Sequence, residues 1–485
     1  MVAVDPSLIW LSIAVVTLTT MYIRRKLNQP YSNAPVLSVS FIEKLKLVGG
    51  MTEFVKRGYE QFGGATFQYT TFRGRRQVLV CNDELINELK MLPAENASFA
   101  SWSQVITQVD AILPLYAGGA KLIYWPEFAV KISHRWFKST LWKDLYTTFP
   151  QLYEDVVQGW ATQIDSEEPL FSLARKAIMP TVARYLVGAP LCNDPEFLEK
   201  VDELTHHIGL GSQISLMMPK ILKRPMVRCF TKFFSVKAYM DKTLHKLAAE
   251  RSGKTEGLYD YFSVALAAVE KSNKPDWNVD RIITDFSTNA FAAHHTTSTT
   301  MSNVLLELAV RPEYQSRIRE EVRRVTAEKG WTLEAIDEMV HLDSFMRESR
   351  RFRPLADMMV NRLVNKDTTL SDGTKLSRGM NVSALYSARE MDDTFYKSPK
   401  EFDGFRFVGS NDRFTDADGP RYLAFGAGKH ACPGRFFAAA IVKTSVAHLL
   451  DQYELLPGSE KLEFEISFEE QRLPSMKDRV LFKRL

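Results

Sequence analysis

One cysteine of this chain stands in a loop suited to close approach by a flat ligand. Cys432 follows Gly426 and Gly428 and precedes Pro433. Two glycines at alternate positions let a loop turn tightly and let its backbone come close to a planar group. Proline suits the first turn of a helix because it has no N–H to leave unpaired. The pattern predicts a helix start whose amides and dipole stabilise a thiolate at Cys432, and such a thiolate is a suitable iron ligand.

Other chemistry is open to the same cysteine. Cys432 also fits a buried thiol, or a nucleophile with His430 as a base close by in sequence. His430 and Cys432 are half of a zinc site as well, although the sequence has no CxxC pair to complete a deaminase centre. The loop alone therefore leaves the metal open. The remaining cysteines, at 81, 192 and 229, are too widely spaced for a disulfide framework, and we expect them to be small buried side chains.

Three further stretches carry residues that can act together with this loop. Glu348 and Arg351 lie three residues apart, so on a helix their side chains can meet. Residues 402–407 read Phe-Asp-Gly-Phe-Arg-Phe and include Arg406. Residues 292–297 read Ala-Ala-His-His-Thr-Thr, and a threonine inside a helix can donate to the carbonyl one turn back.

Together the four stretches resemble the signature motifs of the cytochrome P450 family, in the family's order. The loop matches FxxGxxxCxG at Phe425, Gly428, Cys432 and Gly434. Residues 348–351 match the ExxR of the K helix, residues 402–407 resemble the following meander, and residues 292–297 resemble the oxygen-binding motif A/G-G-x-D/E-T-T. An ExxR alone occurs by chance in many helices, but all four motifs in order are strongly specific. The resemblance covers essentially the whole chain.

The resemblance implies a fold and a cofactor. The fold is that of the cytochrome P450s, mainly α with small β-sheets, in one large domain. The cofactor is haem b, with the Cys432 thiolate as the axial ligand of the iron. Phe425, Gly426 and Gly428 then belong to the haem-binding loop. By the same resemblance, a buried network holds that loop as scaffold, and its members are Glu348, Arg351 and Arg406.

The haem propionates need positive partners. By resemblance these are His430, two residues before the cysteine, and Arg362, on the strand that follows the K helix. The third partner usually comes from an early helix, where the family's pattern is not clean in this chain. His134 or Arg135 is the candidate there.

A long helix is expected where oxygen is activated. Residues 280–310 contain no Pro or Gly and predict a helix of about 45 Å, long enough to cross a domain. By resemblance, Thr296 is the hydroxyl that stabilises bound dioxygen and guides protons. The chain departs from the family at His295, which replaces the usual acid. A histidine can relay protons near neutral pH, but it can also simply pack. His294 is expected to be a bystander.

The other elements are expected from periodicity and turn residues. Residues 67–81 predict a hairpin, and residues 360–382 predict two extended runs around a turn at 371–374. Helices are expected at residues 83–91, 126–157, 235–251, 312–329, 342–351 and 433–452. A mostly apolar substrate pocket is expected from residues 102–114, 355–359 and 473–476, with Asn289, Phe291 and Ala293. Asp357 is an exception there, which either pairs with a basic residue or faces out.

The N-terminus carries the one long apolar run. Residues 7–23 are about 17 residues long, nearly enough to span a hydrocarbon core of roughly 30 Å, and residues 24–26 read Arg-Arg-Lys. A cleaved signal peptide has its positive charge before the apolar stretch, and a buried core helix is the other alternative. We expect a transmembrane anchor with a basic stop-transfer in residues 1–27. Residues 28–485 would be the catalytic domain, on the cytosolic side of the endoplasmic reticulum membrane.

Composition and resemblance together give an expected activity. The chain has 485 residues, 45% of them hydrophobic, and its net charge of +4 argues against an extended nucleic-acid surface. The resemblance implies a monooxygenase that inserts an oxygen atom from O2 into a lipophilic substrate, with electrons from NADPH–cytochrome P450 reductase. Residues 342–348 and 435–438 look fungal in style, which implies a membrane-bound enzyme of natural-product biosynthesis acting on a terpenoid or related compound. The alternatives are a haem-thiolate isomerase that needs no reductase, and a non-catalytic haem-binding protein.

Overall fold

The computed structural model describes most of the chain after the expected anchor. The described residues are 32–40, 43, 49–71, 75–107, 128–218, 221–468 and 470–485. Residues 1–27, with the expected anchor and its basic cluster, lie outside these ranges. Within the ranges, no helix combines the length and the apolar character that a bilayer crossing needs.

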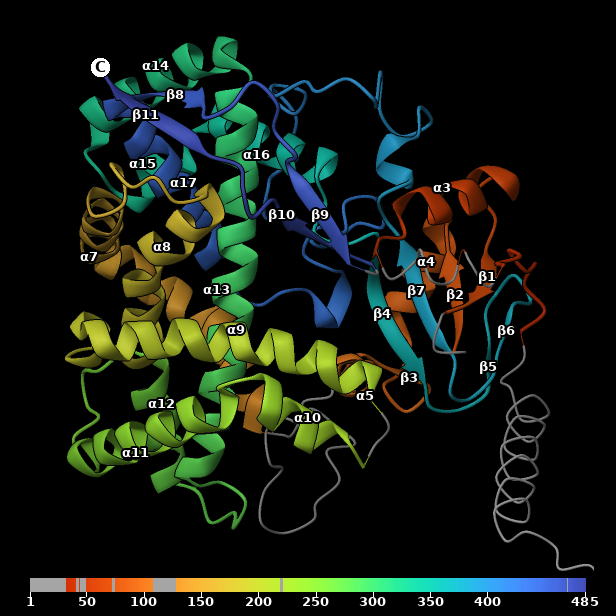
Figure 1. Cartoon of the computed structure of the whole chain (residues 1–485), viewed down its shortest axis with the longest axis horizontal. Helices are drawn as coiled ribbons and strands as arrows, with labels where there is room; N and C mark the ends of the chain where they lie inside the picture. Colours follow the sequence, from red (N-terminus) through yellow and green to blue (C-terminus); the bar gives the residue numbers. More distant parts are fainter. Residues whose placement is uncertain are drawn as a thin grey trace, which may run out of the picture.

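Helix α13 (Val279–Ala309) runs through the middle of the molecule, between a helical side and a sheet side (Figure 1). It has 31 residues, so it is about 46 Å long. The Asn278 side chain caps its start by accepting a hydrogen bond from the Arg281 amide. The sequence-based expectation of a helix over residues 280–310 is confirmed. The helix packs against elements from many parts of the chain.

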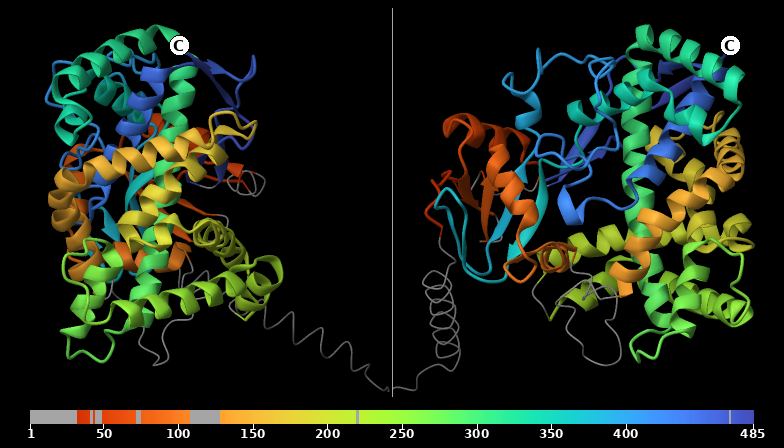
Figure 2. Two further views of the ribbon diagram at one scale, coloured as in Figure 1. Left: turned by 90° about the vertical axis from the view of Figure 1, so that its left-hand side faces the viewer. Right: turned by 180° about the vertical axis from the view of Figure 1, so that it is seen from behind.

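The helical side is built around one large apolar core. Its leucines, phenylalanines and tryptophans come from helices that lie far apart in sequence. The helices are α7 (Leu141–Ala161), α8 (Leu170–Val187), α9 (Pro195–Met217), α11 (Phe233–Arg251), α12 (Tyr261–Glu270), α14 (Pro312–Lys329), α15 (Leu333–Asp337), α16 (Val340–Phe352) and α17 (Arg435–Gln452). Seen from behind, α13 again passes through this group (Figure 2). The predicted helices at 235–251, 312–329 and 342–351 are confirmed.

The sheet side holds five strands in the order β1-β2-β7-β4-β3. The strands are β1 (Phe67–Thr70), β2 (Arg76–Val80), β3 (Ala97–Ser98), β4 (Met358–Val364) and β7 (Asn381–Leu385). β2 and β7 pair in parallel, and the other neighbours pair antiparallel. The predicted hairpin is therefore β1–β2. The two predicted extended runs are β4 and β7, with β5 (Thr368–Thr369) and β6 (Lys375–Leu376) flanking the expected turn.

Short helices complete the sheet side and the connections. α3 (Thr52–Gln61) and α4 (Asp83–Met91) lie beside the five-stranded sheet (Figure 1), and α4 has the predicted bounds. α5 (Phe99–Thr107) and α10 (Lys223–Phe230) follow at the edge of the helical side. The remaining short turns are η2 (Ala129–His134), η3 (Trp136–Thr140), η4 (Leu191–Asn193), η5 (Arg389–Met391) and η6 (Gly428–His430).

Two small two-stranded sheets near the C-terminus were not predicted. β8 (Tyr453–Pro457) pairs with β11 (Val480–Arg484), and β9 (Glu465–Phe468) pairs with β10 (Gln471–Pro474). The β9–β10 hairpin lies between α13 and the sheet (Figure 1). The Asp357 amide donates to the Glu470 carbonyl at 2.8 Å, and the Arg472 amide donates to the Leu355 carbonyl at 2.9 Å. The hairpin is therefore attached to the segment that leads into β4.

The structure corrects two expectations and extends a third. The last long helix begins at Arg435 rather than at Pro433, because Pro433 and Gly434 form a turn before it. Cys229 is exposed rather than buried, because α10 buries only Val227. The predicted helix over 126–157 is described from residue 128, and its first part is wound more widely, as two π-helical turns that lead into α7.

Candidate active site

The cysteine loop is fixed by its backbone. Gly426 and Gly428 have φ values of 71° and 67°, in the left-handed region that favours glycine. A Cβ atom at Gly428 would lie 3.3 Å from the Lys90 carbonyl oxygen, so a larger residue is crowded there. The Cys432 amide donates to the Phe425 carbonyl at 2.7 Å. The loop therefore holds the cysteine in one place without help from its side chain.

The surroundings of Cys432 suit a thiolate that ligates a metal cation. Burial raises the pKa of the Cys432 thiol above its ordinary value, whereas a hydrogen bond from the Gly434 amide and the charges of Arg435 and Arg350 act in the opposite direction. A buried thiolate needs a cation beside it, and a bound iron supplies that charge. This donor set fits the axial position of a haem.

Arg362, on β4, is a buried cation whose hydrogen-bonding capacity is largely unused. It is 1% exposed, and its Nη1 donates to the Asn361 carbonyl at 2.8 Å. Its Nε and Nη2 have no hydrogen-bond partner in the described part of the chain. Burial alone lowers its pKa to about 10. A buried guanidinium without an anion is costly, so the site fits a carboxylate ligand.

The three predicted propionate partners lie close enough to influence one another. Burial lowers the pKa of His430 to about 4, and the charges of Arg362, His134 and Lys429 add to that effect. Burial also lowers the pKa of His134. The residues come from three separate elements, η6, β4 and η2. Such a group of basic side chains fits the two propionates of haem b. Arg135, the alternative to His134, is exposed.

Thr296 lies on an exposed face in the middle of α13. Its hydroxyl donates to the Ala292 carbonyl at 2.7 Å, the predicted bond to the preceding turn. Ala292 and Thr296 are both exposed, although residues 297–309 of the same helix are buried. An exposed strip of this kind, lined by small side chains, leaves room for a flat cofactor and a small ligand bound to it. The predicted bond is therefore present and the Thr296 face is open, while its role beside the iron stays a prediction.

His295 and His294 have different surroundings. The His295 ring packs against Phe291, with centroids 5.2 Å apart, and its Nε2 is buried with no partner among the described residues. Burial and the charge of His294 lower the pKa of His295 to about 3, so it is neutral at cytosolic pH. His294 is fully buried between α8 and α9, within hydrogen-bond distance of the Arg175 carbonyl (2.9 Å) and the Thr205 hydroxyl (3.3 Å). His294 therefore connects α13 to α8 and α9, which agrees with its expected absence from the chemistry.

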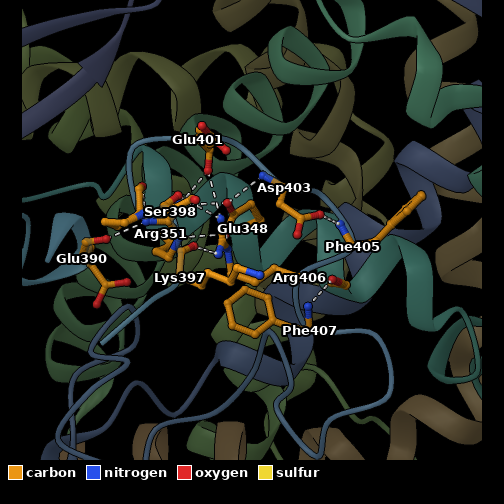
Figure 3. Close-up of polar contacts among 12 residues, drawn as sticks. Glu348, Arg351, Glu390, Lys397, Ser398, Glu401, Asp403, Phe405, Arg406 and Phe407 are labelled. Atoms are coloured by element: carbon orange, nitrogen blue, oxygen red, sulfur yellow. Dashed lines mark hydrogen bonds and ion pairs between the residues drawn. The ribbon is translucent and has the colours of Figure 1, made fainter. Parts of the chain in front are cut away.

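Glu348, Arg351 and Arg406 meet in one network (Figure 3). Arg351 donates to both Glu348 carboxylate oxygens, at 2.7 and 2.8 Å, and Arg406 Nε donates to Oε2 at 3.1 Å. The Asp403 amide also donates to Glu348, at 2.9 Å. Glu348 and Arg351 are fully buried. The carboxylate is thus fully used as an acceptor, which a buried charge requires.

The same two arginines hold the meander by its backbone. Arg351 Nη1 donates to the carbonyls of Glu390 (2.5 Å) and Pro399 (2.9 Å). Arg406 donates to the carbonyls of Lys397 (2.5 Å) and Glu401 (2.9 Å). Figure 3 shows these contacts converging from the meander onto α16. The network therefore shapes the chain that leads to the cysteine loop.

The predicted substrate pocket is described in part, because residues 108–114 lie outside the described ranges. Asp357 does not face out: it is fully buried and pairs with Arg472 (3.2 Å), and the Thr52 hydroxyl donates to it at 3.1 Å. Sequence reasoning missed Arg472 as this partner, and it also missed Arg350. Arg350 stands beside Arg351 within the ExxR motif, and that second arginine was the available signal.

Comparisons with known proteins agree with this geometry. A family model described as Cytochrome P450 matches residues 131–480. The chain is 30% identical to "Cytochrome P450 monooxygenase janQ" of Penicillium janthinellum, over 83% of this chain and 82% of that protein. It is 29% identical to "Cytochrome P450 monooxygenase paxQ" of Penicillium paxilli, over 89% and 86%.

Solved structures share the fold at lower identity. The retinoic acid-bound cyanobacterial CYP120A1 superposes with a TM-score of 0.71 at 20% identity, over 93% of this chain and 99% of that one. The cytochrome P450DA haem domain gives 0.70 at 16% identity, over 93% and 98%. The family model covers well over half of the chain, and the cofactor of that family is haem b on a cysteine thiolate. The chain therefore belongs to the cytochrome P450 family of haem-thiolate monooxygenases.

Proposed function

We propose that this P450 is a membrane-bound enzyme that inserts one atom of dioxygen into a terpenoid or related lipophilic natural product, with electrons from NADPH–cytochrome P450 reductase. When bound, the haem supplies the reductive activation of dioxygen, in which two electrons and two protons convert the second oxygen atom to water. The observation that carries the proposal is the exposed Ala292–Thr296 face of α13. An enzyme without oxygen chemistry has no need of a hydroxyl at that place.

The chain's own residues have different roles at this face. The Thr296 hydroxyl, whose proton bonds the Ala292 carbonyl, has lone pairs left to accept a proton donor such as water. Its position allows it to hold and pass a proton at Oγ1. His295 is neutral there, so it does not add a fixed positive charge beside the site. Cys432, His430, Arg362 and His134 hold the cofactor.

The side chains around this face support a lipophilic substrate. Phe291 and Ala293 on α13, Met359 on β4 and Leu473 on β10 are each half-buried and apolar. Apolar walls bind an apolar ligand and exclude water. The relatives named above are monooxygenases of Penicillium species, which supports a place in fungal natural-product biosynthesis.

The reaction is tested with the full chain in microsomes that contain the reductase. We expect the reduced, carbon monoxide-bound protein to show the thiolate-type Soret band, and Cys432→Ser to lose it. With NADPH and ¹⁸O2, we expect a product that carries one ¹⁸O atom. A product of unchanged mass, formed without NADPH, would instead identify the isomerase. Haem-loaded protein that forms no product from any tested lipid would support the binding protein.

The substrate class is tested by spectral titration of the same holoprotein. A panel of sesqui-, di- and triterpenoids is compared with fatty acids of matched carbon number. We expect several terpenoids to displace the water ligand of the iron and to shift the Soret band, and the fatty acids to do so more weakly. A response confined to the fatty acids contradicts the terpenoid assignment.

Membrane attachment rests on residues 1–27 and is supported by α10. Ile221, two residues before α10, and Phe230, its last residue, are 84% and 63% exposed. Residues 204–240 contain no Asp or Glu, which favours contact with anionic headgroups. We expect the full chain to stay in microsomes after alkaline carbonate extraction, with a C-terminal tag open to added protease. Release by carbonate, or a protected tag, contradicts this topology.

A further inference from the structure

Arg350 is a buried arginine beside the cysteine loop that the haem-binding residues described above do not include. It lies on α16, is 7% exposed, and donates through Nη2 to the Ala424 carbonyl at 3.1 Å. Its guanidinium carbon lies 5.9 Å from the centroid of the Phe425 ring. The Phe425 carbonyl in turn accepts the Cys432 amide at 2.7 Å. Arg350 therefore contacts the two residues that lead into the loop of the haem ligand.

Among the residues that the structure describes, no carboxylate pairs with the charge of Arg350. Its Nε and Nη1 are buried and have no hydrogen-bond partner in the described part of the chain. Glu348 is used by Arg351 and Arg406. Arg347, one turn earlier on α16, pairs with carboxylates instead, those of Asp412 and Asp416. Two arginines of the same helix thus differ in whether their charge is neutralised.

The ionisable groups that act on Arg350 are Tyr422, Tyr386 and Cys432. Burial raises the pKa of both tyrosines far above neutrality, so they carry no charge. Cys432 is different, because its sulfur is a thiolate when it ligates iron. That thiolate is the negative charge with which the charge of Arg350 interacts.

Arg350 keeps its charge although it is buried. Burial lowers its pKa, but an arginine remains protonated in proteins. Charges interact more strongly where water is excluded. Arg435 also lies near the loop and donates to the Cys432 carbonyl at 3.1 Å, but it is only half-buried, so solvent screens it more. The charge of Arg435 still has the larger effect on Cys432, and the charge of the buried Arg350 adds to it.

We propose that Arg350 is a positioning residue that acts through its charge: it stabilises the Cys432 thiolate and raises the reduction potential of the haem iron. Reduction from ferric to ferrous adds one electron and therefore one negative charge to the haem–thiolate unit. A fixed cation nearby stabilises the more negative state. This inference rests on the family's cofactor and not on the proposed substrate or reductase, so it can fail while those proposals stand.

The test is a spectroelectrochemical titration of substrate-free holoprotein, with wild type compared with Arg350→Gln, Arg350→Met and Arg350→Lys. For the two neutral variants we expect the equilibrium constant of reduction to fall about tenfold, which corresponds to about 59 mV for one electron. The lysine variant should stay within about threefold of wild type. After reduction with dithionite under carbon monoxide, the neutral variants should lose more of the thiolate-type band to the thiol-type band.

The control removes one positive charge far from the loop. Arg317→Gln, at an exposed position on α14, should leave the equilibrium constant unchanged. If glutamine and lysine shift the potential equally, or if glutamine leaves it at the wild-type value, the charge has no such role. If the neutral variants cannot hold haem but the lysine variant can, the charge is still what the site requires. Loss of haem from the lysine variant as well would show that shape matters instead, and the proposal would be wrong.

Discussion

Thr296 makes the same type of hydrogen bond as several other hydroxyls of α13, but it is exposed and they are not. Ser298, Thr299 and Thr300 also donate to the carbonyl four residues earlier, and all three are buried. These bonds satisfy a hydroxyl inside a helix without a partner from outside. At Thr296 the same bond leaves the oxygen facing the proposed reaction site, so its function at the residue scale depends on where the helix is open.

Replacing Thr296 by alanine should uncouple electron use from product. Without the hydroxyl, proton delivery loses its guide, and we expect product per NADPH to fall about tenfold or more while NADPH consumption continues. The measurement compares NADPH, hydrogen peroxide and product in one reaction. Ser298→Ala loses the same kind of bond on a buried face and should keep its coupling. Equal coupling in wild type and Thr296→Ala would remove this hydroxyl from the proton path.

His294 should make the stability of the protein depend on pH. Burial lowers its pKa to about 3 and the charge of Arg175 acts in the same direction, although Asp202 lies 3.6 Å from Nδ1. The unfolded chain binds a proton there below about pH 6.5, whereas the folded chain does not until about pH 3. Stability is therefore complete above pH 6.5 and is lost as the pH falls. Between pH 6.5 and 5 this one group removes about 2 kcal/mol.

The pH effect can be measured by thermal unfolding between pH 7.5 and 5. His294→Gln should have the shallower slope of stability against pH, because its amide cannot bind that proton. Thr205→Val is the matched control, since it removes the hydroxyl contact of His294 but no titrating group. Its unfolding temperature should drop while its slope stays that of wild type. Identical slopes for wild type and His294→Gln would contradict the buried neutral histidine.

At the scale of elements, α16 and α14 each carry one carboxylate of a matched pair. Glu348 forms an i,i+3 pair with Arg351 in the core, and Glu320 forms an i,i+3 pair with Arg317 on the surface of α14. Glu348→Gln leaves two arginines near one neutral amide and should cost about 3–5 kcal/mol. Glu320→Gln should cost less than about 0.5 kcal/mol. Haem content and unfolding temperature report both variants. A stable, haem-replete Glu348→Gln protein would show that the network is not needed.

The β9–β10 hairpin depends on the Asp357–Arg472 pair. Asp357→Asn leaves the buried Arg472 with the more distant Glu465 carboxylate (3.7 Å), which lies on the hairpin itself, so we expect the hairpin to shift relative to β4. A bulky azole, which reaches from the iron to the pocket wall, should bind about tenfold more weakly, whereas imidazole itself should bind as before. Lys477→Met, which removes an exposed pair with Glu463 in the same segment, is the control. A parallel loss of both ligands would indicate damage to the haem site instead.

For the molecule as a whole, the sequence predicted elements better where local signals were strong. Helix α13 lies within one residue of its expected bounds because residues 280–310 lack Pro and Gly and Asn278 caps the start. The β9–β10 hairpin is local, but it was missed because residues 469–470 read Glu-Glu and give no turn signal. The strands β8 and β11 were missed because they lie far apart in sequence and the tertiary fold brings them together. The exposure of Cys229 was missed for a similar reason, since it depends on which face of α10 has neighbours.

The site shows the same division between motif and environment. The spacing of Glu348 and Arg351 was enough to expect that their side chains could meet, and the family resemblance added Arg406. No spacing could reveal that Arg350 lies buried without a carboxylate, because its neighbours come from residues 386–432. Likewise, the neutrality of His295 follows from the side chains that bury it, and only the fold decides which ones do. Sequence motifs therefore predict which residues contact one another. They do not predict the charges and the burial around those residues.

The arginines of α16 have a consequence for the order in which the protein is made. Arg350 and Arg351 hold carbonyls of residues 390, 399 and 424, in a segment with little helix or strand of its own. During synthesis the N-terminal parts of a chain emerge first, so α16 leaves the ribosome before the segment that it shapes. A nascent chain arrested before Cys432 already contains the arginines of α16 but lacks the cysteine that ligates the iron. Ligation of the iron by Cys432 is therefore among the last steps in the synthesis and folding of this enzyme.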